Sequence, residues 1–243
     1  MIDTHAHLEM CDDPDGAVER AREAGVTRIL TVGTGPSSWA AARELAARHE
    51  GVSAILGVHP HEAELGVDGL ADLVGDERVA AVGETGLDFY RDRAPRDAQR
   101  AAFTAQLELA AQAGKAVVIH SRAAEEEILR LLEPFAGTVV LHCFSAPHVL
   151  PSALERGYYV SFAGNVTYPS ATDLRLAATQ VPVDRILAET DTPYLAPQPR
   201  RGRPNEPAYV VHTLAALAEA RGDDPSELER QIEENAQRAF SLP

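Results

Sequence analysis

The chain has 243 residues, of which 45% are hydrophobic and 24% are charged, and the charged side chains sum to −15 at pH 7. With only 17 Gly and 16 Pro, the composition excludes a collagen-like or low-complexity chain. The acidic balance argues against a protein that coats nucleic acid through bulk charge. It does not exclude a phosphate-containing substrate, because bound divalent cations reverse the local potential.

The sequence lacks a membrane helix, a signal peptide and a disulfide scaffold, and these three features indicate the cellular compartment. No apolar run approaches the roughly 18 residues that a membrane helix needs, so we expect no membrane association. The start of the chain, Met1 to His5, has neither the basic nor the apolar region of a signal peptide. Two cysteines, Cys11 and Cys143, cannot build a disulfide scaffold. We therefore expect a soluble, reduced, cytoplasmic protein.

Short runs rich in β-branched residues alternate with Ala-, Glu- and Arg-rich stretches of helical period. The predicted strands, in chain order, are Met1–Thr4, Arg28–Val32, Val52–Gly57, Val79–Gly83, Ala116–Ile119, Thr138–Leu141, Tyr158–Phe162 and Arg185–Ala188. The predicted helices are Asp15–Ala24, Ser37–His49, Gly69–Val74, Arg96–Ala113, Ala124–Leu132, Ala146–Arg156, Ser170–Thr179, Glu206–Arg221 and Pro225–Phe240. This order predicts an α/β fold, a single (β/α)8 TIM barrel over residues 1–243. A doubly wound sheet is the alternative, but a Gly-rich phosphate turn does not follow the first strand.

Chemically active side chains follow the predicted strands. Six of the nine histidines lie within a few residues of a strand end. In a parallel barrel all carboxyl ends of the strands meet at one mouth, where catalytic residues gather. The residues expected at this mouth are His5, His7, His59, His61, Glu84, His120, His142, Glu189 and Asp191.

The His5-Ala6-His7 pair predicts a metal site, because residues i and i+2 of an extended chain point the same way. Imidazole and carboxylate ligands suit zinc, manganese or magnesium. Four histidines and two carboxylates are too many for one open site and fit two divalent ions about 3.5–4 Å apart. Glu84 is expected to bridge them, because its strand lies between the two groups of imidazoles.

Structural alternatives remain open at several of these positions. His120 and His142 are equally explained as core histidines that hydrogen-bond to the backbone. Glu189 is expected either to support a metal ligand or to form a salt bridge to the barrel wall. Cys143 beside His142 is expected to be buried rather than reactive.

Several ordered motifs resemble the TatD family of metal-dependent hydrolases and deoxyribonucleases. They are Ile2-Asp3-Thr4-His5-Ala6-His7, Gly57-Val58-His59-Pro60-His61, Gly83-Glu84-Thr85-Gly86-Leu87-Asp88, His120-Ser121-Arg122, His142-Cys143-Phe144-Ser145, Glu189-Thr190-Asp191-Thr192-Pro193-Tyr194-Leu195 and Arg201-Gly202-Arg203-Pro204-Asn205-Glu206-Pro207. The resemblance spans essentially the whole chain. It implies an amidohydrolase-type TIM barrel whose metal ligands are His5, His7, Glu84, His120, His142 and Asp191.

The roles of His59 and His61 stay unassigned, although both match a family motif. Glu9 stands where the family usually has a shorter Asp or Asn, which is expected to alter a contact at the rim without removing a ligand. Thr192 stands where Ser is common, an exchange that preserves the hydroxyl.

Metal-assisted hydrolysis of a phosphodiester is the predicted reaction, with DNA as the substrate. Asp191 is expected to accept the proton of the nucleophilic water, and Glu84 to hold both ions. Arg122 and Arg203 are candidates for binding a substrate phosphate. The alternative is that both are ordinary charged residues of the surface. Tyr90 and Tyr194 are equally candidates for stacking a base or for packing at the rim.

The resemblance adds 3′–5′ exonuclease action on single strands. Two other functions remain open at this point, since a fold does not select a substrate. The first is metal-dependent hydrolysis of an ester or amide, such as a D-aminoacyl-tRNA linkage, an activity also attributed to relatives. The second is a catalytically inactive barrel that binds nucleic acid or a protein partner. The presence of candidate ligands at all six positions argues against the inactive barrel.

Overall fold

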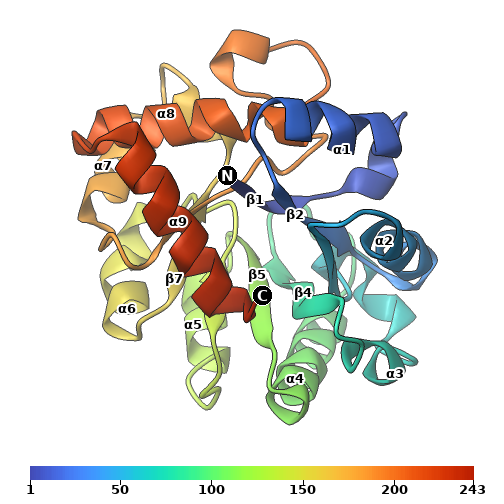
Figure 1. The fold of residues 1–243 in the computed structure, drawn as a ribbon. Coiled ribbons are helices and arrows are strands. Elements are labelled where there is room, and N and C mark those ends of the chain that lie inside the picture. The colour runs from blue at the N-terminus through green and yellow to red at the C-terminus, as the bar shows by residue number, and fades with distance from the viewer.

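Eight parallel strands curl around a shared apolar centre. The computed structural model describes residues 1–243. Each strand pairs with the next one in the chain, so that the order is β1-β2-β3-β4-β5-β6-β7-β8 (Figure 1). The strands are β1 (Ile2–Ala6), β2 (Arg28–Gly33), β3 (Val52–Leu56), β4 (Val79–Asp88), β5 (Ala116–Arg122), β6 (Val139–Leu141), β7 (Tyr159–Phe162) and β8 (Ile186–Ala188).

A ring of helices covers the outside of the strands (Figure 1). They are α1 (Pro14–Glu23), α2 (Pro36–Arg48), α3 (Ala71–Val74), α4 (Arg96–Ala113), α5 (Glu125–Leu131), α6 (Leu150–Glu155), α7 (Thr172–Gln180), α8 (Val210–Arg221) and α9 (Pro225–Phe240). The helices and strands bury one apolar cluster of 65 residues between them. The predicted (β/α)8 barrel is therefore confirmed. None of the helices is both long and apolar enough to cross a membrane.

Three strands run at least two residues further toward the mouth than the sequence predicts. β4 continues to Asp88 instead of ending at Gly83, and β5 continues to Arg122 instead of Ile119. These extensions pair with each other, through Asp88 and Arg122, beyond a shift of register that follows Val82. The ranges predicted from sequence end earlier because polar residues interrupt the apolar runs. β1 is likewise longer and ends at Ala6.

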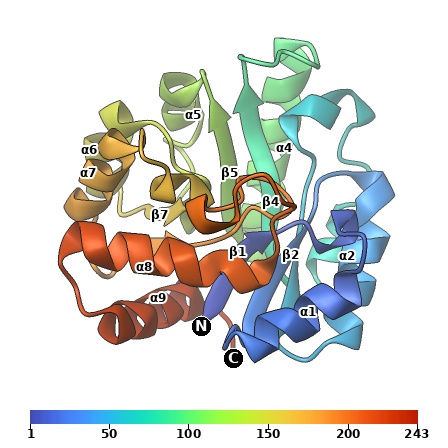
Figure 2. The same cartoon turned by 90° about the horizontal axis from the view of Figure 1, so that it is seen from above.

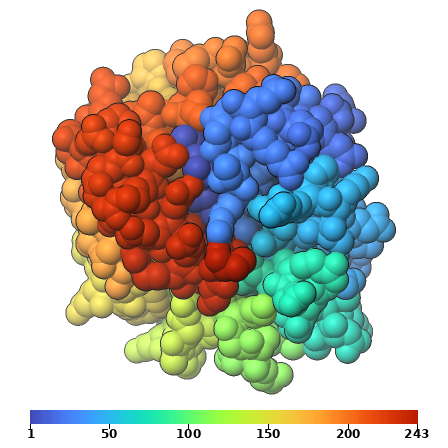
Figure 3. All heavy atoms as spheres, viewed as in Figure 1, coloured from blue at the N-terminus to red at the C-terminus, as the bar shows by residue number.

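Helix α9 closes the barrel at the amino-terminal ends of the strands. Figure 2 shows α9 and both termini at one end of the molecule, and Figure 3 shows the C-terminal segment spread across that end. The Asn235 side chain donates hydrogen bonds to the carbonyls of Val183 and Ile186 beside β8. The terminal amine of Met1 lies 3.2 Å from Glu229 on α9. The opposite end, at the carboxyl ends of the strands, is left for the functional site.

The seam between the last strand and the first is closed by few backbone contacts. The His7 amide donates to the Thr192 carbonyl at 2.8 Å, and the Asp191 amide donates to the His5 carbonyl at 2.9 Å. Both contacts lie beyond the end of β8, at the mouth. The seam therefore also fixes the spacing between the His5-Ala6-His7 segment and Asp191.

The fully buried Asp3 side chain supplies further closing contacts lower in the seam. Its carboxylate accepts hydrogen bonds from the Thr190 amide at 2.9 Å and from the Thr190 hydroxyl at 2.6 Å. The neighbouring Thr4 hydroxyl donates to the Ala188 carbonyl at 3.1 Å. Side chains thus replace part of the backbone ladder that the other strand pairs have.

We expect Asp3→Ala to destabilise the protein, because it removes the acceptor of the buried Thr190 amide, whereas the Thr190 hydroxyl still has the Thr192 hydroxyl as a partner. An unsatisfied buried donor costs about 1–3 kcal/mol, so the free energy of unfolding should fall by at least that much. Urea unfolding of metal-free protein measures the change. Asp97→Ala is the control, since the Asp97 side chain is 97% exposed and its loss should cost less than about 1 kcal/mol. Equal stability of the two variants would contradict a closing role for Asp3.

Candidate metal centre

The carboxylate of Glu84 lies at the centre of the mouth. The structure brings all six sequence-predicted ligands around it, and each of the other five lies within 4.0 Å of Glu84 or of a residue that contacts Glu84. They come from five different segments of the barrel: His5 and His7 from β1 and its end, Glu84 from β4, His120 from β5, His142 after β6, and Asp191 after β8.

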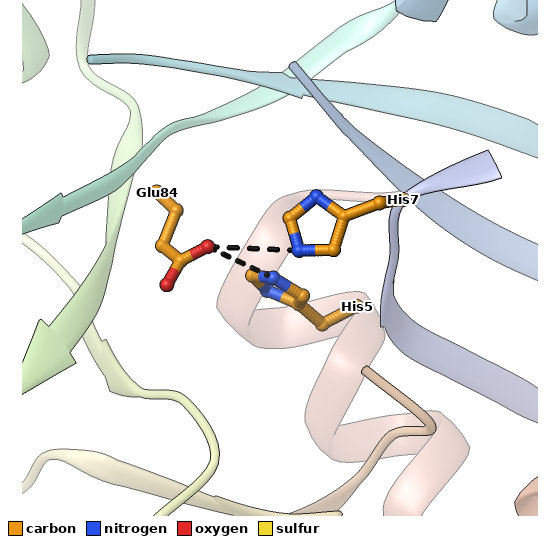
Figure 4. Close-up of side chains that lie close together, drawn as sticks. All are labelled: His5, His7 and Glu84. Carbon is orange, nitrogen blue, oxygen red and sulfur yellow. Dashed lines mark ion pairs between the residues drawn. The ribbon is translucent and has the colours of Figure 1, made fainter. Parts of the chain in front are cut away.

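The two oxygens of Glu84 face two different sets of imidazoles. Its Oε2 lies 3.5 Å from His5 Nε2 and 3.7 Å from His7 Nε2 (Figure 4). Its Oε1 lies 2.7 Å from His120 Nδ1 and 2.9 Å from His142 Nε2. A carboxylate between two sets of nitrogen ligands has the arrangement of a bridging ligand in a two-ion site.

Asp191 reaches the same centre from the seam. Its Oδ1 lies 3.5 Å from His7 Nε2, and its side chain is 13% exposed. The other side of this carboxylate is therefore open to a solvent molecule at the mouth.

Several buried polar atoms in the cluster have no partner, which is how an intact set of metal ligands is expected to look without its ion. Both ring nitrogens of His5, Nδ1 of His7 and Oε2 of Glu189 are buried without a hydrogen bond. Each such atom costs about 1–3 kcal/mol if nothing binds it. Burial, together with the charge of His142, lowers the pKa of His5. His5 is therefore neutral, the form that ligates metal. The residues present fit divalent cations.

The ionisation of the cluster favours a negative Glu84. Burial by itself favours the protonated acid, but His142, His59 and His120 outweigh it and hold the pKa of Glu84 well below its usual value. Burial also opposes protonation of His7, yet Asp191 and Glu84 raise the pKa of His7 to about 9. The imidazole proton and a bound cation thus compete for the same carboxylates.

Two further carboxylates orient the ligand imidazoles from behind. His120 directs Nε2 at Asp88 Oδ2, 3.3 Å away, while its Nδ1 faces Glu84. His142 directs Nδ1 at Glu189 Oε1, 3.0 Å away. A carboxylate behind a metal-binding histidine fixes the ring and its tautomer. The alternative that His120 and His142 are core histidines bound to the backbone does not fit these partners, and the Glu189 carboxylate contacts His142 and the Cys143 amide rather than a basic side chain of the barrel wall.

Asp88 was not singled out in the sequence. The signal that finds it is the alternation of a strand: Glu84, Gly86 and Asp88 share one face once β4 extends to Asp88.

Two buried glutamines on α4, neither of which the sequence pattern reveals, hold the backbone of the site. Gln99 accepts from the Asp88 amide at 2.9 Å and donates to the Asp88 carbonyl at 3.3 Å. Gln106, seven residues later, accepts from the Val58 amide at 2.7 Å and donates to the Val58 carbonyl at 3.0 Å. Both glutamines lie on the buried face of α4 with Phe103, but the helical period of the sequence alone does not distinguish them from surface glutamines.

The loop after β3 brings both unassigned histidines to the cluster. His59 Nε2 lies 3.5 Å from Glu84 Oε1, and burial lowers the pKa of His59 to about 4, against the influence of Glu84. His61 Nε2 lies 2.9 Å from Asp88 Oδ2. The loop therefore belongs to the site and is not merely near it.

Exposed aromatic residues stand at the rim. The Arg122 guanidinium lies over the Tyr90 ring, 4.2 Å from its centroid, and Tyr90 is 66% exposed. The Tyr194 ring centroid lies 6.1 Å from that of His7, and Tyr194 is 51% exposed. Arg203 is exposed and has no hydrogen bond or ion pair through its side chain.

Glu9 lies beside His7 at the edge of the cluster. Its Oε1 is 4.0 Å from His7 Nδ1, its Oε2 is buried without a partner, and burial raises its pKa. Cys143, next to His142, is only partly buried as a residue, and burial raises the pKa of its thiol well above the usual value. A raised thiol pKa disfavours the reactive thiolate form. The expectation that Cys143 is a buried residue is met only in part, since the residue as a whole keeps some exposure.

A buried cluster of imidazoles and carboxylates at the carboxyl ends of eight parallel barrel strands defines a metal-dependent hydrolase. The family model described as TatD related DNase matches residues 2–241. The chain belongs to the TatD family, as its motifs predict.

The relatives and solved structures agree with this assignment. The chain is 38% identical over 259 residues to the "Uncharacterized metal-dependent hydrolase TatD" of Mycobacterium tuberculosis, covering 100% of this chain and 98% of that protein. It is 39% identical over 241 residues to the "3′-5′ ssDNA/RNA exonuclease TatD" of Cronobacter sakazakii, covering 94% and 92% of the two. The crystal structure of YJJV, a TatD homolog from Escherichia coli K12, superposes with a TM-score of 0.93 at 29% identity, over 100% of this chain and 98% of that chain.

Proposed function

We propose that this protein is a metal-dependent 3′–5′ exonuclease that hydrolyses phosphodiester bonds of single-stranded DNA. The observation that carries the proposal is the division of the Glu84 oxygens between two sets of imidazoles at the open mouth. Relatives named as 3′-5′ ssDNA/RNA exonucleases support the substrate class. The exposed Tyr90 and Tyr194 support a single strand, because unpaired bases stack on aromatic rings.

The donor set accommodates two divalent ions. His5, His7 and Asp191 would hold one ion, His120 and His142 would hold the other, and Glu84 would bind both. Four nitrogen ligands together with two carboxylates favour zinc or manganese over magnesium, which prefers oxygen. When bound, such ions polarise a phosphoryl oxygen and lower the pKa of a water molecule toward neutrality.

The protein side chains supply the remaining functions. The Asp191 carboxylate, open to solvent on one side, accepts the proton that the attacking water loses. Asp88 and Glu189 keep the His120 and His142 rings in the tautomers that ligate. Arg122, held over Tyr90, donates hydrogen bonds to a substrate phosphate near the rim.

We place this activity in one catalytic domain over residues 1–243 that works in the cytoplasm. Two free cysteines, Cys11 and Cys143, support a reducing compartment.

The test is a comparison of substrates with and without metal. Single-stranded DNA labelled at its 5′ end should give a ladder shortened from the 3′ end, whereas duplex DNA and D-aminoacyl-tRNA should be poor substrates. Chelation should abolish cleavage and lower the thermal midpoint, because ions that bind only the folded state stabilise it. Zinc or manganese should restore both, with two ions per chain by elemental analysis.

Two outcomes would contradict the proposal. Deacylation of the tRNA without cleavage of DNA would assign a different bond to the same site. DNA binding that persists after complete removal of metal, without cleavage in its presence, would indicate an inactive barrel.

A further inference from the structure

His59 lies among the metal ligands, but the two-ion proposal gives it no role. Its ring centroid is 4.5 Å from that of His120, and its Nε2 is 3.5 Å from Glu84 Oε1. By distance alone His59, Glu84 and His120 form a group that fits a cation, since their ligand atoms lie within 4.8 Å of one another. The hydrogen bonds of the His59, His120 and His142 rings show whether His59 can act as a metal ligand.

The partner of the second ring nitrogen fixes the tautomer of each histidine. The His61 backbone amide donates to His59 Nδ1 at 3.1 Å. An amide N–H only donates, so His59 Nδ1 carries no proton and the proton of the neutral ring is on Nε2. The nitrogen of His59 that faces Glu84 is therefore a donor without a free lone pair, and it cannot bind a cation.

The ligands His120 and His142 show the opposite arrangement. The outer nitrogen of each faces a carboxylate oxygen, of Asp88 and of Glu189. Carboxylates only accept, so each outer nitrogen can keep its proton when the inner proton, which faces Glu84 Oε1 at 2.7 Å in His120 and 2.9 Å in His142, gives way to a cation. The inner nitrogens of these two rings would then present a lone pair to the centre, which the Nδ1 contact of His59 does not allow for its Nε2. A backbone amide behind the ring thus marks His59 as a hydrogen-bond donor, whereas carboxylates behind the rings of His120 and His142 mark these two as metal ligands.

The segment that carries His59 is held firmly in place. The fully buried Gln106 side chain binds both the amide and the carbonyl of Val58. The His59 amide itself donates to the Thr34 carbonyl at 2.8 Å. The Nε2–H group is therefore directed into the mouth before substrate arrives, which is what makes a hydrogen-bond donor effective in catalysis.

We propose that His59 is a catalytic residue whose neutral Nε2–H donates a hydrogen bond to a non-bridging phosphoryl oxygen of the substrate as negative charge develops on it. This inference rests on the proposed phosphodiester hydrolysis. A neutral donor at this point strengthens binding of the transition state without competing with the cations for Glu84.

The test uses two amide substitutions that separate the ring nitrogens. In His59→Gln the side-chain NH2 reaches the place of Nε2 and keeps the donor. In His59→Asn the amide oxygen replaces Nδ1, so the contact with the His61 amide survives but the distal donor is lost. His212→Asn is the control, because His212 lies on α8 and contacts Tyr209, not the cluster.

We expect both His59 variants to keep the wild-type metal content, and the same affinity for zinc in titrations of metal-free protein. Loss of one such donor typically lowers kcat by about 10²–10³-fold, which is the expectation for His59→Asn. His59→Gln should stay within about tenfold of wild type. Loss of an ion from His59→Asn, or an equal fall of kcat in both variants, would overturn the proposal.

Nitrogen-15 NMR of labelled histidines provides a readout that does not depend on turnover. His59 should show an unprotonated Nδ1 and a protonated Nε2, both with and without zinc. A protonated Nδ1 would overturn the donor assignment, even if His59→Asn were unstable. A wild-type protein that cleaves no phosphodiester would refute the proposed function itself, and this result would appear before any variant is compared.

Discussion

The Glu84→Gln variant is expected to lose its bound metal and its turnover together. Glutamine keeps the shape of the side chain but removes the charge that faces His5 and His7 on one side and His120 and His142 on the other. Without that charge the remaining ligands no longer hold two cations close together. Metal ions contribute several kcal/mol of transition-state stabilisation, so kcat should fall by about 10³-fold or more.

Elemental analysis after dialysis against a weak chelator, together with kcat at saturating metal, measures both effects. Glu127→Gln is the matched control, because Glu127 lies on α5 and pairs with Arg100. It should keep two ions and full activity. Full metal occupancy in Glu84→Gln, whatever its activity, would show that Glu84 does not bridge the ions.

The sequence predicts the barrel and its mouth because both follow from local patterns. Apolar runs of strand length alternate with helical periodicity, and polar residues such as His5 and His142 come where each run ends. A parallel barrel places all such positions at one end. The six predicted ligands needed no knowledge of long-range packing.

The residues that the sequence did not reveal depend on packing between distant segments. Asp88 becomes part of the site only because β4 continues past Glu84 to pair with β5. Gln99 and Gln106 act through contacts from α4 to the backbone of other segments, and helical periodicity does not distinguish such glutamines from surface ones. The role of His59 depends on one backbone amide, that of His61.

The Asp191→Asn variant is expected to keep its metal and its fold but to lose most of its turnover. Asn retains one oxygen next to His7 and has no carboxylate to accept a proton. General-base catalysis is commonly worth about 10²–10⁴-fold, and kcat should fall by that factor. Asn is also the right replacement for the backbone, because Asp191 has a φ of 59°, a conformation that Asn tolerates better than Ala does.

A purely structural role for Asp191 would be to cap the turn that follows it. The structure gives that role to another residue, since the Thr192 amide donates to the Thr190 hydroxyl at 3.3 Å. The Asp191 backbone amide bonds to His5 and is unchanged in the variant. The thermal midpoint of metal-saturated Asp191→Asn should therefore stay near that of wild type and of the control Asp184→Asn, at the far end of the barrel. Lost stability with unchanged kcat in the folded fraction would instead make Asp191 a structural residue and would require another base at the mouth.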